Sequence, residues 1–201
     1  GYGKSDKVEL PRPISYMHNE GLEILPQVLD LIDHDKYILL GHSDGASISI
    51  IYTGDKKNER LKALIVMAPH VSVEKVCIDS IEKSKTLYQD VIREPLSKYH
   101  DDVDNAFWGW NQAWLHPDFV DWNIEEYLSP IEIPVLVIQG ADDEYGTINQ
   151  VDKVCSQVFG KAEKIILPDC KHSPHRDQTE LTLEGVSRFI KKEVFEKTEL
   201  T

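Results

Sequence analysis

Cysteine is scarce in this sequence, which has three among 201 residues: Cys77, Cys155 and Cys170. Such scattered cysteines are too few for a disulfide framework, and no CxxC pair suggests a structural zinc site. Long apolar runs are also missing, because runs such as 63–68 are far shorter than the roughly 20 residues that cross a bilayer. No signal-peptide pattern is visible in the first residues. We therefore expect a cytoplasmic protein with no metal centre and no membrane partner.

Basic residues are also few in comparison with acidic ones. The 22 lysines and arginines stand against 35 aspartates and glutamates, which leaves a formal net charge of -13. Phosphate backbones and anionic membrane surfaces are bound by clustered basic side chains, so neither is expected as the main partner. The content of hydrophobic residues, 41%, and of charged residues, 28%, is typical of folded proteins. The composition therefore predicts an ordinary globular protein.

Four short apolar runs indicate strands that are buried on both faces. They cover residues 37–40, 63–68, 134–138 and 164–167. Helical periodicity is found before, between and after them, in 15–32, 46–52, 149–159 and 181–197. Strands that alternate with helices predict a parallel sheet covered on both sides. The expected fold class is therefore α/β, with a mostly parallel sheet flanked by helices.

The segment 71–129 differs from the rest of the chain, because it has no obvious strand and contains all four tryptophans. Two compatible interpretations are open. The aromatic residues can pack into a small core of their own. Alternatively, the segment can be a helical cap over an active site, with Trp108 and Trp110 in a pocket for an apolar substrate group. We expect a core made of 1–70 and 130–201, with this segment as a cap insertion.

The pentapeptide Gly41-His42-Ser43-Asp44-Gly45 has the pattern G-x-S-x-G. Average glycine and serine usage produces this pattern by chance in on the order of one in fifteen chains of this length. Its position is more informative, because it directly follows a strand and precedes a helix, the context of a nucleophile elbow. We expect the sharp turn to require both glycines, since no side chain fits two residues to either side of Ser43. The helix amino terminus would then stabilise negative charge that develops beside Ser43.

A serine hydroxyl becomes a good nucleophile when a base takes its proton and an acid orients that base. Three carboxylates follow the third strand: Asp142, Asp143 and Glu144. Two histidines follow the fourth strand: His172 and His175. Both groups come at the carboxyl ends of strands, where open α/β sheets hold their sites. The chain order serine, acid, histidine differs from the orders in chymotrypsin and subtilisin.

Together these features resemble the α/β-hydrolase superfamily over nearly the whole chain. Residues 1–6 are similar to the family's loop after its fourth strand, 41–45 match its elbow, and 135–143 match the strand that carries its acid. The spacing in the family implies that Asp143 is the acid. It also implies that His172 is the base, although a lysine precedes it where the family usually has glycine.

The resemblance also implies roles for neighbouring residues. The backbone N–H of Asp44 would be one oxyanion donor. His42 corresponds to a residue that is commonly buried beside the nucleophile, and a structural role is expected for it. His70 follows the second strand and is expected to be an ordinary loop histidine, with a place in the substrate pocket as the alternative.

The function implied by the resemblance is hydrolysis of a carboxylic ester or related acyl substrate through an acyl intermediate on Ser43. A carbon-carbon bond hydrolase, an acyltransferase and a non-catalytic ligand-binding or inactive member remain open alternatives. A haloalkane dehalogenase is disfavoured because it would need an aspartate at position 43. No nucleotide or flavin fingerprint is present, so we expect a small-molecule substrate and no cofactor.

The first residues of the sequence lead to one further expectation. The first residue is Gly1, and the strands that precede the elbow strand in the family, with the loop that donates the second oxyanion N–H, are not found in the sequence. Residues 37–40 would then form an apolar edge strand, which invites aggregation or pairing with another chain. We expect an amino-terminally truncated α/β-hydrolase fold that self-associates and is nearly inactive on its own.

Overall fold

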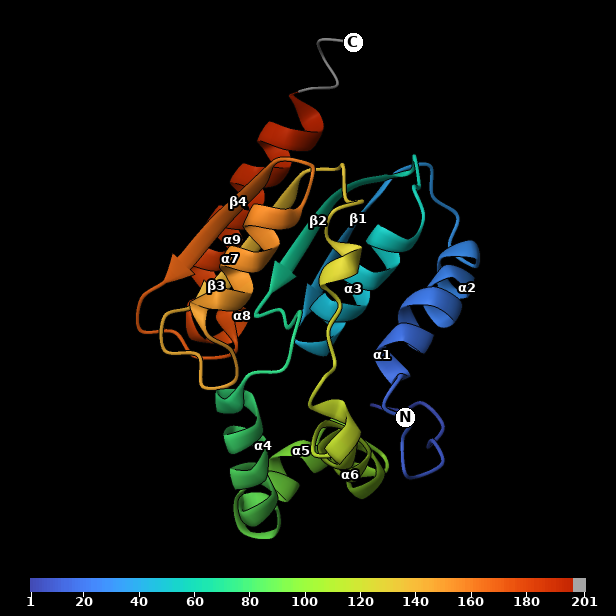
Figure 1. Cartoon of the computed structure of the whole chain (residues 1–201), viewed down its shortest axis with the longest axis vertical. Helices are drawn as coiled ribbons and strands as arrows, with labels where there is room; N and C mark the ends of the chain where they lie inside the picture. The colour runs from blue at the N-terminus through green and yellow to red at the C-terminus, as the bar shows by residue number, and fades with distance from the viewer. Residues whose placement is uncertain (197–201) are drawn as a thin grey trace. The chain divides into compact units, whose positions relative to one another are not determined.

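The structure is a computed structural model that describes residues 1–196 (Figure 1). The chain divides into two compact units. One, here called the helical unit, consists of Gly1–Tyr16 and Val73–Trp122. The other, here called the sheet unit, consists of Met17–Ser72 and the chain from Asn123 onward.

The sheet unit is built on four parallel strands: β1 (Tyr37–His42), β2 (Leu61–Met67), β3 (Val135–Gly140) and β4 (Ala162–Leu167). They are hydrogen-bonded in the order β1-β2-β3-β4. This arrangement confirms the expected α/β class, and each strand lies close to its expected bounds. Because the strands are parallel, the turns after β1, β3 and β4 lie at the same edge of the sheet.

Helices cover both faces of this sheet: α3 (Asp44–Asp55) and α7 (Ile148–Gln157) on one, and α9 (Thr179–Ile190) on the other (Figure 1). Successive side chains of a strand point to opposite faces. In β2, Ile65 therefore lies in the same core cluster as Phe189 of α9, while Leu64 points to the opposite layer. Both β2 residues are fully buried, which explains why the strand reads as a continuous apolar run.

Shorter helical pieces complete the sheet unit: α1 (Tyr16–Asn19), η1 (Glu20–Ile24), α2 (Leu25–Asp30), η4 (Glu125–Tyr127), α8 (Pro174–Asp177) and η5 (Lys191–Phe195). The helix expected at 15–32 is thus interrupted by a π-helical turn. Pro26 has no N–H for the carbonyl four residues earlier, and the turn before it widens, so that the Leu25 N–H bonds to the Glu20 carbonyl. Of the helix expected at 181–197, the last residue lies outside the described residues.

The helical unit contains α4 (Lys75–Leu87), η2 (Tyr88–Ile92), α5 (Arg93–Ser97), α6 (Val103–Trp114) and η3 (Pro117–Phe119). Its aromatic side chains pack on one another. The rings of Tyr88 and Phe107 stack with centroids 4.0 Å apart, and those of Phe119 and Trp122 stack at 5.4 Å. For these residues the structure supports the interpretation that the segment forms a small core of its own.

The helical unit does not have the bounds 71–129 that the sequence predicted. Gly1–Tyr16 belongs to it, because Asn105 makes two hydrogen bonds with the backbone of Val8 across 97 residues of sequence. At the other end, the chain from Asn123 onward already belongs to the sheet unit. Contacts between residues so distant in sequence leave no periodic signal, so the bounds of the helical unit differ from those expected for the cap. That residues 71–129 act as a cap stays a prediction.

No helix among residues 1–196 combines the length and the apolar character needed to cross a membrane. No disulfide joins the three cysteines in the described part of the chain, where Cys77 and Cys170 are buried and Cys155 is half-buried. They therefore contribute to packing and not to cross-links.

Candidate active site

The turn between β1 and α3 places Ser43 in an unusual backbone conformation, with φ 54° and ψ -124°. Such a conformation costs of order 1–3 kcal/mol for a residue other than glycine, and it is concentrated at functional sites. Close packing holds the turn, because a Cβ on Gly41 would lie 2.3 Å from the carbonyl oxygen of Gly45. The expected elbow is therefore present, and Gly41 is required by it.

Gly45 departs from the expectation. A Cβ built on this residue meets no atom within 4 Å among the described residues, apart from its chain neighbours and the nearby backbone of its own helix. The prediction that both glycines leave no space for a side chain is therefore right for Gly41 and wrong for Gly45 in this structure. The asymmetry arises because the chain folds back over Gly41, whereas Gly45 lies in the first turn of α3.

Three side chains that the sequence predicted as a catalytic set are brought together. Ser43 Oγ lies 2.8 Å from His172 Nε2, and His172 Nδ1 lies 3.0 Å from each carboxylate oxygen of Asp143. The imidazole is 16% exposed and the carboxylate 1% exposed. We refer to these residues as the triad. Their catalytic roles stay a prediction, but the geometry is that of a nucleophile, a base and an orienting acid.

The surroundings of Asp143 favour its ionised form. Burial by itself would raise the pKa of the carboxyl, but the hydrogen bond and charge of His172 and the hydrogen bond from the Tyr145 N–H together lower the pKa below its ordinary value. The Gly146 N–H adds a longer contact of 3.3 Å to Oδ1. The carboxylate is therefore charged at neutral pH, as an acid that orients and stabilises an imidazolium must be.

The turns that carry the acid and the base are locked together. A Cβ on Gly140 would lie 2.2 Å from the carbonyl oxygens of both Cys170 and Lys171, and the Asp142 N–H donates to the Cys170 carbonyl at 2.9 Å. Lys171 replaces the family's glycine without strain, because the left-handed residue of this turn is Asp169, with φ 49°.

His42 contacts the base through its backbone. His42 Nε2 donates to the His172 carbonyl at 2.7 Å, and its ring lies 4.8 Å from that of His175. Burial lowers the pKa of His42, which keeps the imidazole neutral and able to hold one N–H on this carbonyl. These contacts support the structural role expected for His42.

His70 is also close to the triad. It is buried, its carbonyl accepts from Ser47 Oγ at 2.6 Å, and its ring centroid lies 5.8 Å from that of His172. It therefore lies beside the base, and its contact with a substrate stays a prediction.

Two residues of the site were missed by the sequence analysis. The ring of Tyr145 lies 4.8 Å from that of His172, and Gln139 donates from Nε2 to Asp143 Oδ2 at 2.7 Å. A signal for Gln139 was present, because it is a polar residue at the end of an otherwise apolar strand. No comparable signal distinguished Tyr145 from other loop tyrosines.

Trp108 and Trp110, expected to line a substrate pocket, lie half-buried in the helical unit. Trp108 packs edge-on against Tyr88 at 5.2 Å, and Trp110 packs edge-on against Phe107 at 5.9 Å. Both therefore contribute to the aromatic core of that unit, and their contact with a substrate stays a prediction.

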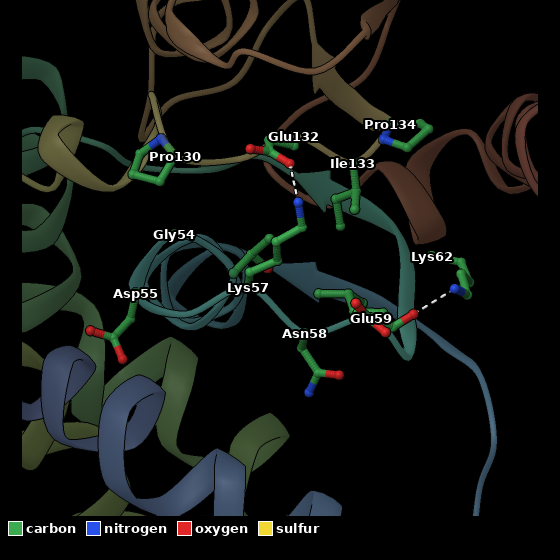
Figure 2. Close-up of a pocket in the computed structure, with 12 residues that line it drawn as sticks. Gly54, Asp55, Lys57, Asn58, Glu59, Lys62, Pro130, Glu132, Ile133 and Pro134 are labelled. Atoms are coloured by element: carbon green, nitrogen blue, oxygen red, sulfur yellow. Dashed lines mark hydrogen bonds and ion pairs between the residues drawn. The ribbon is translucent and has the colours of Figure 1, made fainter.

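A cavity of about 680 Å³ lies elsewhere in the sheet unit (Figure 2). It is lined by Leu61 and Pro134, at the amino ends of β2 and β3, and the ion pair of Lys57 with Glu132 crosses it. The triad follows the carboxyl ends of the strands. This cavity is therefore at the opposite edge of the sheet and takes no part in the site.

A parallel sheet with a serine elbow after one strand, an acid after a later strand and a histidine after the last defines the α/β-hydrolase fold. The chain has the fold of α/β hydrolases, and solved structures of such hydrolases are similar to it. The chain is a distant homologue of a proline iminopeptidase of Saccharolobus solfataricus, with 25% identity over 94% of this chain and 73% of that protein.

Two solved structures illustrate the likeness in fold. An esterase from Exiguobacterium antarcticum is 17% identical, with a TM-score of 0.69, over 96% of this chain and 79% of that one. A serine hydrolase involved in carbazole degradation is 16% identical, with a TM-score of 0.70, over 94% of this chain and 75% of that one. No protein-family model matches the chain.

Proposed function

We propose that the protein is a serine hydrolase that cleaves a carboxylic ester or a related acyl substrate. The observation that carries this proposal is the hydrogen-bonded set in which Ser43 Oγ lies 2.8 Å from His172 Nε2, on a strained turn at the start of α3. The buried, ionised Asp143 on the other nitrogen of the imidazole supports it further.

In the proposed reaction, His172 Nε2 takes the proton of Ser43 as Oγ attacks the substrate carbonyl carbon. The backbone N–H of Asp44, at the first turn of α3, donates to the oxyanion of the tetrahedral intermediate. The imidazolium then protonates the leaving alcohol, which leaves an acyl-Ser43 intermediate. A water molecule deprotonated by His172 attacks this intermediate. The bond between Ser43 Oγ and the acyl carbon then breaks, the imidazolium returns its proton to Oγ, and the acid is released. Asp143 holds the tautomer and stabilises the imidazolium throughout.

The direct test is labelling with a fluorophosphonate followed by intact-mass measurement. We expect one adduct on the wild-type chain and none on Ser43→Ala, because only an activated serine reacts at an appreciable rate. Hydrolysis of a panel of p-nitrophenyl esters would then identify the acyl class. Absence of labelling would contradict the proposal and favour a non-catalytic member of the fold. Labelling without hydrolysis of any ester would point to a carbon-carbon bond hydrolase or an acyltransferase.

The relative from Saccharolobus solfataricus favours a second candidate, an aminopeptidase that removes an amino-terminal proline. The same acyl-serine chemistry serves amides and esters, so the triad does not separate the two candidates. Release of p-nitroaniline from proline p-nitroanilide, compared with hydrolysis of p-nitrophenyl acetate, separates them. A kcat/KM for the anilide above that for the ester would favour the peptidase.

We also propose that the helical unit influences which substrate is used, through Trp108 and Trp110. The concentration of aromatic residues in this unit motivates the proposal. Trp108→Ala or Trp110→Ala is expected to change the chain-length profile of ester hydrolysis more than the rate with p-nitrophenyl acetate. Equal losses on all esters, together with a lower Tm, would instead favour a role in packing alone.

The proposed partner is accordingly a small ester-like molecule. The proposed compartment is the reducing cytoplasm, which the small number of cysteines supports.

A further inference from the structure

Gln139 is a buried amide next to the candidate acid. It is the fifth residue of β3 and its side chain lies in the core, where the residue is 1% exposed. Its Nε2 donates to Asp143 Oδ2 at 2.7 Å and to the Gly146 carbonyl at 3.0 Å. A single amide therefore bonds both the carboxylate and the loop that follows it.

The orientation of this amide follows from its neighbours. Both atoms that Nε2 faces are acceptors, so the reversed orientation would place Oε1 against a carboxylate and a carbonyl oxygen. In the observed orientation Oε1 is buried and has no hydrogen-bond partner among the described residues. An unsatisfied buried acceptor costs free energy. The carboxylate and the carbonyl therefore set the orientation of the amide, at the cost of one unsatisfied acceptor.

The amide completes the set of donors around Asp143. The Tyr145 N–H and the Gly146 N–H hold Oδ1, Gln139 holds Oδ2, and His172 Nδ1 lies 3.0 Å from both oxygens. With both oxygens held from the protein side, the carboxylate cannot rotate away from the imidazole. Without Gln139, Oδ2 would lose its donor on that side.

We propose that Gln139 is a positioning residue that fixes the orientation of Asp143, and through it the tautomer and direction of the His172 ring. This inference rests on the proposed function. Residues that orient a catalytic group by a hydrogen bond act on the chemical step more than on substrate binding. Gln139 is therefore expected to influence kcat and to leave KM nearly unchanged.

The chain offers a matched control in Gln150, which is 0% exposed. Its Oε1 accepts from the N–H of Val71 at 2.8 Å and from that of Ser72 at 3.4 Å, and its Nε2 donates to the Ser72 carbonyl at 2.9 Å. It is an equally buried amide in the same unit, but these bonds go to the backbone and not to the triad. Its loss should affect stability and not catalysis.

The experiment compares Gln139→Met and Gln150→Met, which keep similar volume and remove the amide. For Gln139→Met we expect kcat on the best p-nitrophenyl ester to fall by about 10- to 100-fold, with KM within about 2-fold. We also expect a lower Tm, because Asp143 Oδ2 and the Gly146 carbonyl lose their donor. For Gln150→Met we expect a lower Tm and a kcat close to wild type. Gln139→Glu, which places a second carboxylate against Asp143, should lose at least as much kcat as Gln139→Met.

A second readout does not need turnover. The far-downfield proton resonance of the His172 Nδ1–H reports its hydrogen bond to Asp143. We expect it to shift or broaden in Gln139→Met and to persist in Gln150→Met. If wild type neither labels nor turns over, the proposed function fails, and this resonance still decides whether Gln139 positions the pair. An unchanged resonance in Gln139→Met, or a wild-type kcat in either Gln139 variant, would overturn the inference.

Discussion

The backbone of Ser43 has a conformation that few serines adopt, and hydrogen bonds to Met67 and Ala46 hold it there. Its N–H donates to the Met67 carbonyl at 2.9 Å, and its carbonyl accepts from the Ala46 N–H at 2.9 Å. The turn is thus tied to β2 on one side and to α3 on the other. Because these bonds fix the backbone, Oγ is presented to His172 before any substrate arrives, which is the preorganisation that catalysis needs.

The first prediction at this scale concerns the triad. Ser43→Ala and His172→Ala should each lower kcat by about 10⁴-fold or more, and the double variant should be no slower than either, because the residues act as a unit. Asp143→Asn should be severe, whereas Asp142→Asn, at an exposed position, should be mild. Steady-state kinetics with a common ester checks all five variants. A dead Asp142→Asn would mean that the wrong carboxylate has been assigned.

The second prediction separates the two glycines of the elbow. Gly41→Ala should prevent folding or lower Tm by about 5–10 °C, because its Cβ would lie 2.3 Å from the Gly45 carbonyl oxygen. Gly45→Ala should be tolerated or raise stability by about 0.5–1 kcal/mol, because alanine suits a helix better and its Cβ meets no described atom outside its own turn. Thermal melts of both variants test this. Equal damage from the two substitutions would contradict it.

At the scale of elements, the site depends on how two turns after neighbouring strands meet. β3 and β4 pair in register from Val135 with Ala162 to Gly140 with Leu167, so the acid and base turns begin side by side. The Ala141 N–H donates to the Leu167 carbonyl at 2.8 Å, which continues the pairing one step beyond the strands. The acid-to-base distance is thus set by strand register and close turn packing as well as by side chains.

This packing predicts a contrast between two glycines near Asp143. Gly140→Ala would push its Cβ to 2.2 Å from two carbonyl oxygens of the base turn and move that turn away. We expect kcat to fall by about 10²-fold, as for a displacement of about 1 Å in a catalytic group. Gly146→Ala is the control, because its Cβ would meet its nearest atom, His70 Cε1, at an ordinary 3.5 Å. Fluorophosphonate labelling rates measure both, and similar rates for the two variants would refute the contrast.

At the scale of the whole molecule, the exposed edge of the sheet is the feature that we expect to determine how the chain associates. Among the described residues, β1 pairs with β2 alone, and Leu40 within it is 51% exposed. Apolar side chains of the turn that follows α2 and leads toward β1, Leu31 and Ile32, are exposed as well. Unpaired backbone groups beside exposed apolar side chains form a template for another strand.

The chain of 201 residues should therefore associate in a concentration-dependent way. Leu40→Lys should reduce this association, because a charge on an edge strand opposes pairing with a second strand. Val120→Lys is the matched control, since Val120 is 63% exposed but belongs to the helical unit. Sedimentation velocity at several concentrations distinguishes the variants. A wild-type chain that stays monomeric throughout would contradict the prediction.

The sequence alone determined the strands, their parallel arrangement, the elbow and the order of serine, acid and histidine, because these depend on short-range periodicity and on local turn chemistry. Its resemblance to a known family then singled out Asp143 and His172, which the structure brings together with Ser43. Short apolar runs and glycine-bounded turns each extend over only a few positions of sequence, so these features could be predicted directly from it.

Only the tertiary structure decided that Gly1–Tyr16 packs with residues almost a hundred positions later, that Gln139 faces Asp143, and that Gly41 is crowded while Gly45 is not. Each of these depends on which atoms come within a few ångströms once the chain has folded. A sequence states what each residue can do by itself. Which neighbours make an amide a positioning group, or a glycine indispensable, depends on the path of the folded backbone, even where those neighbours are only four residues away.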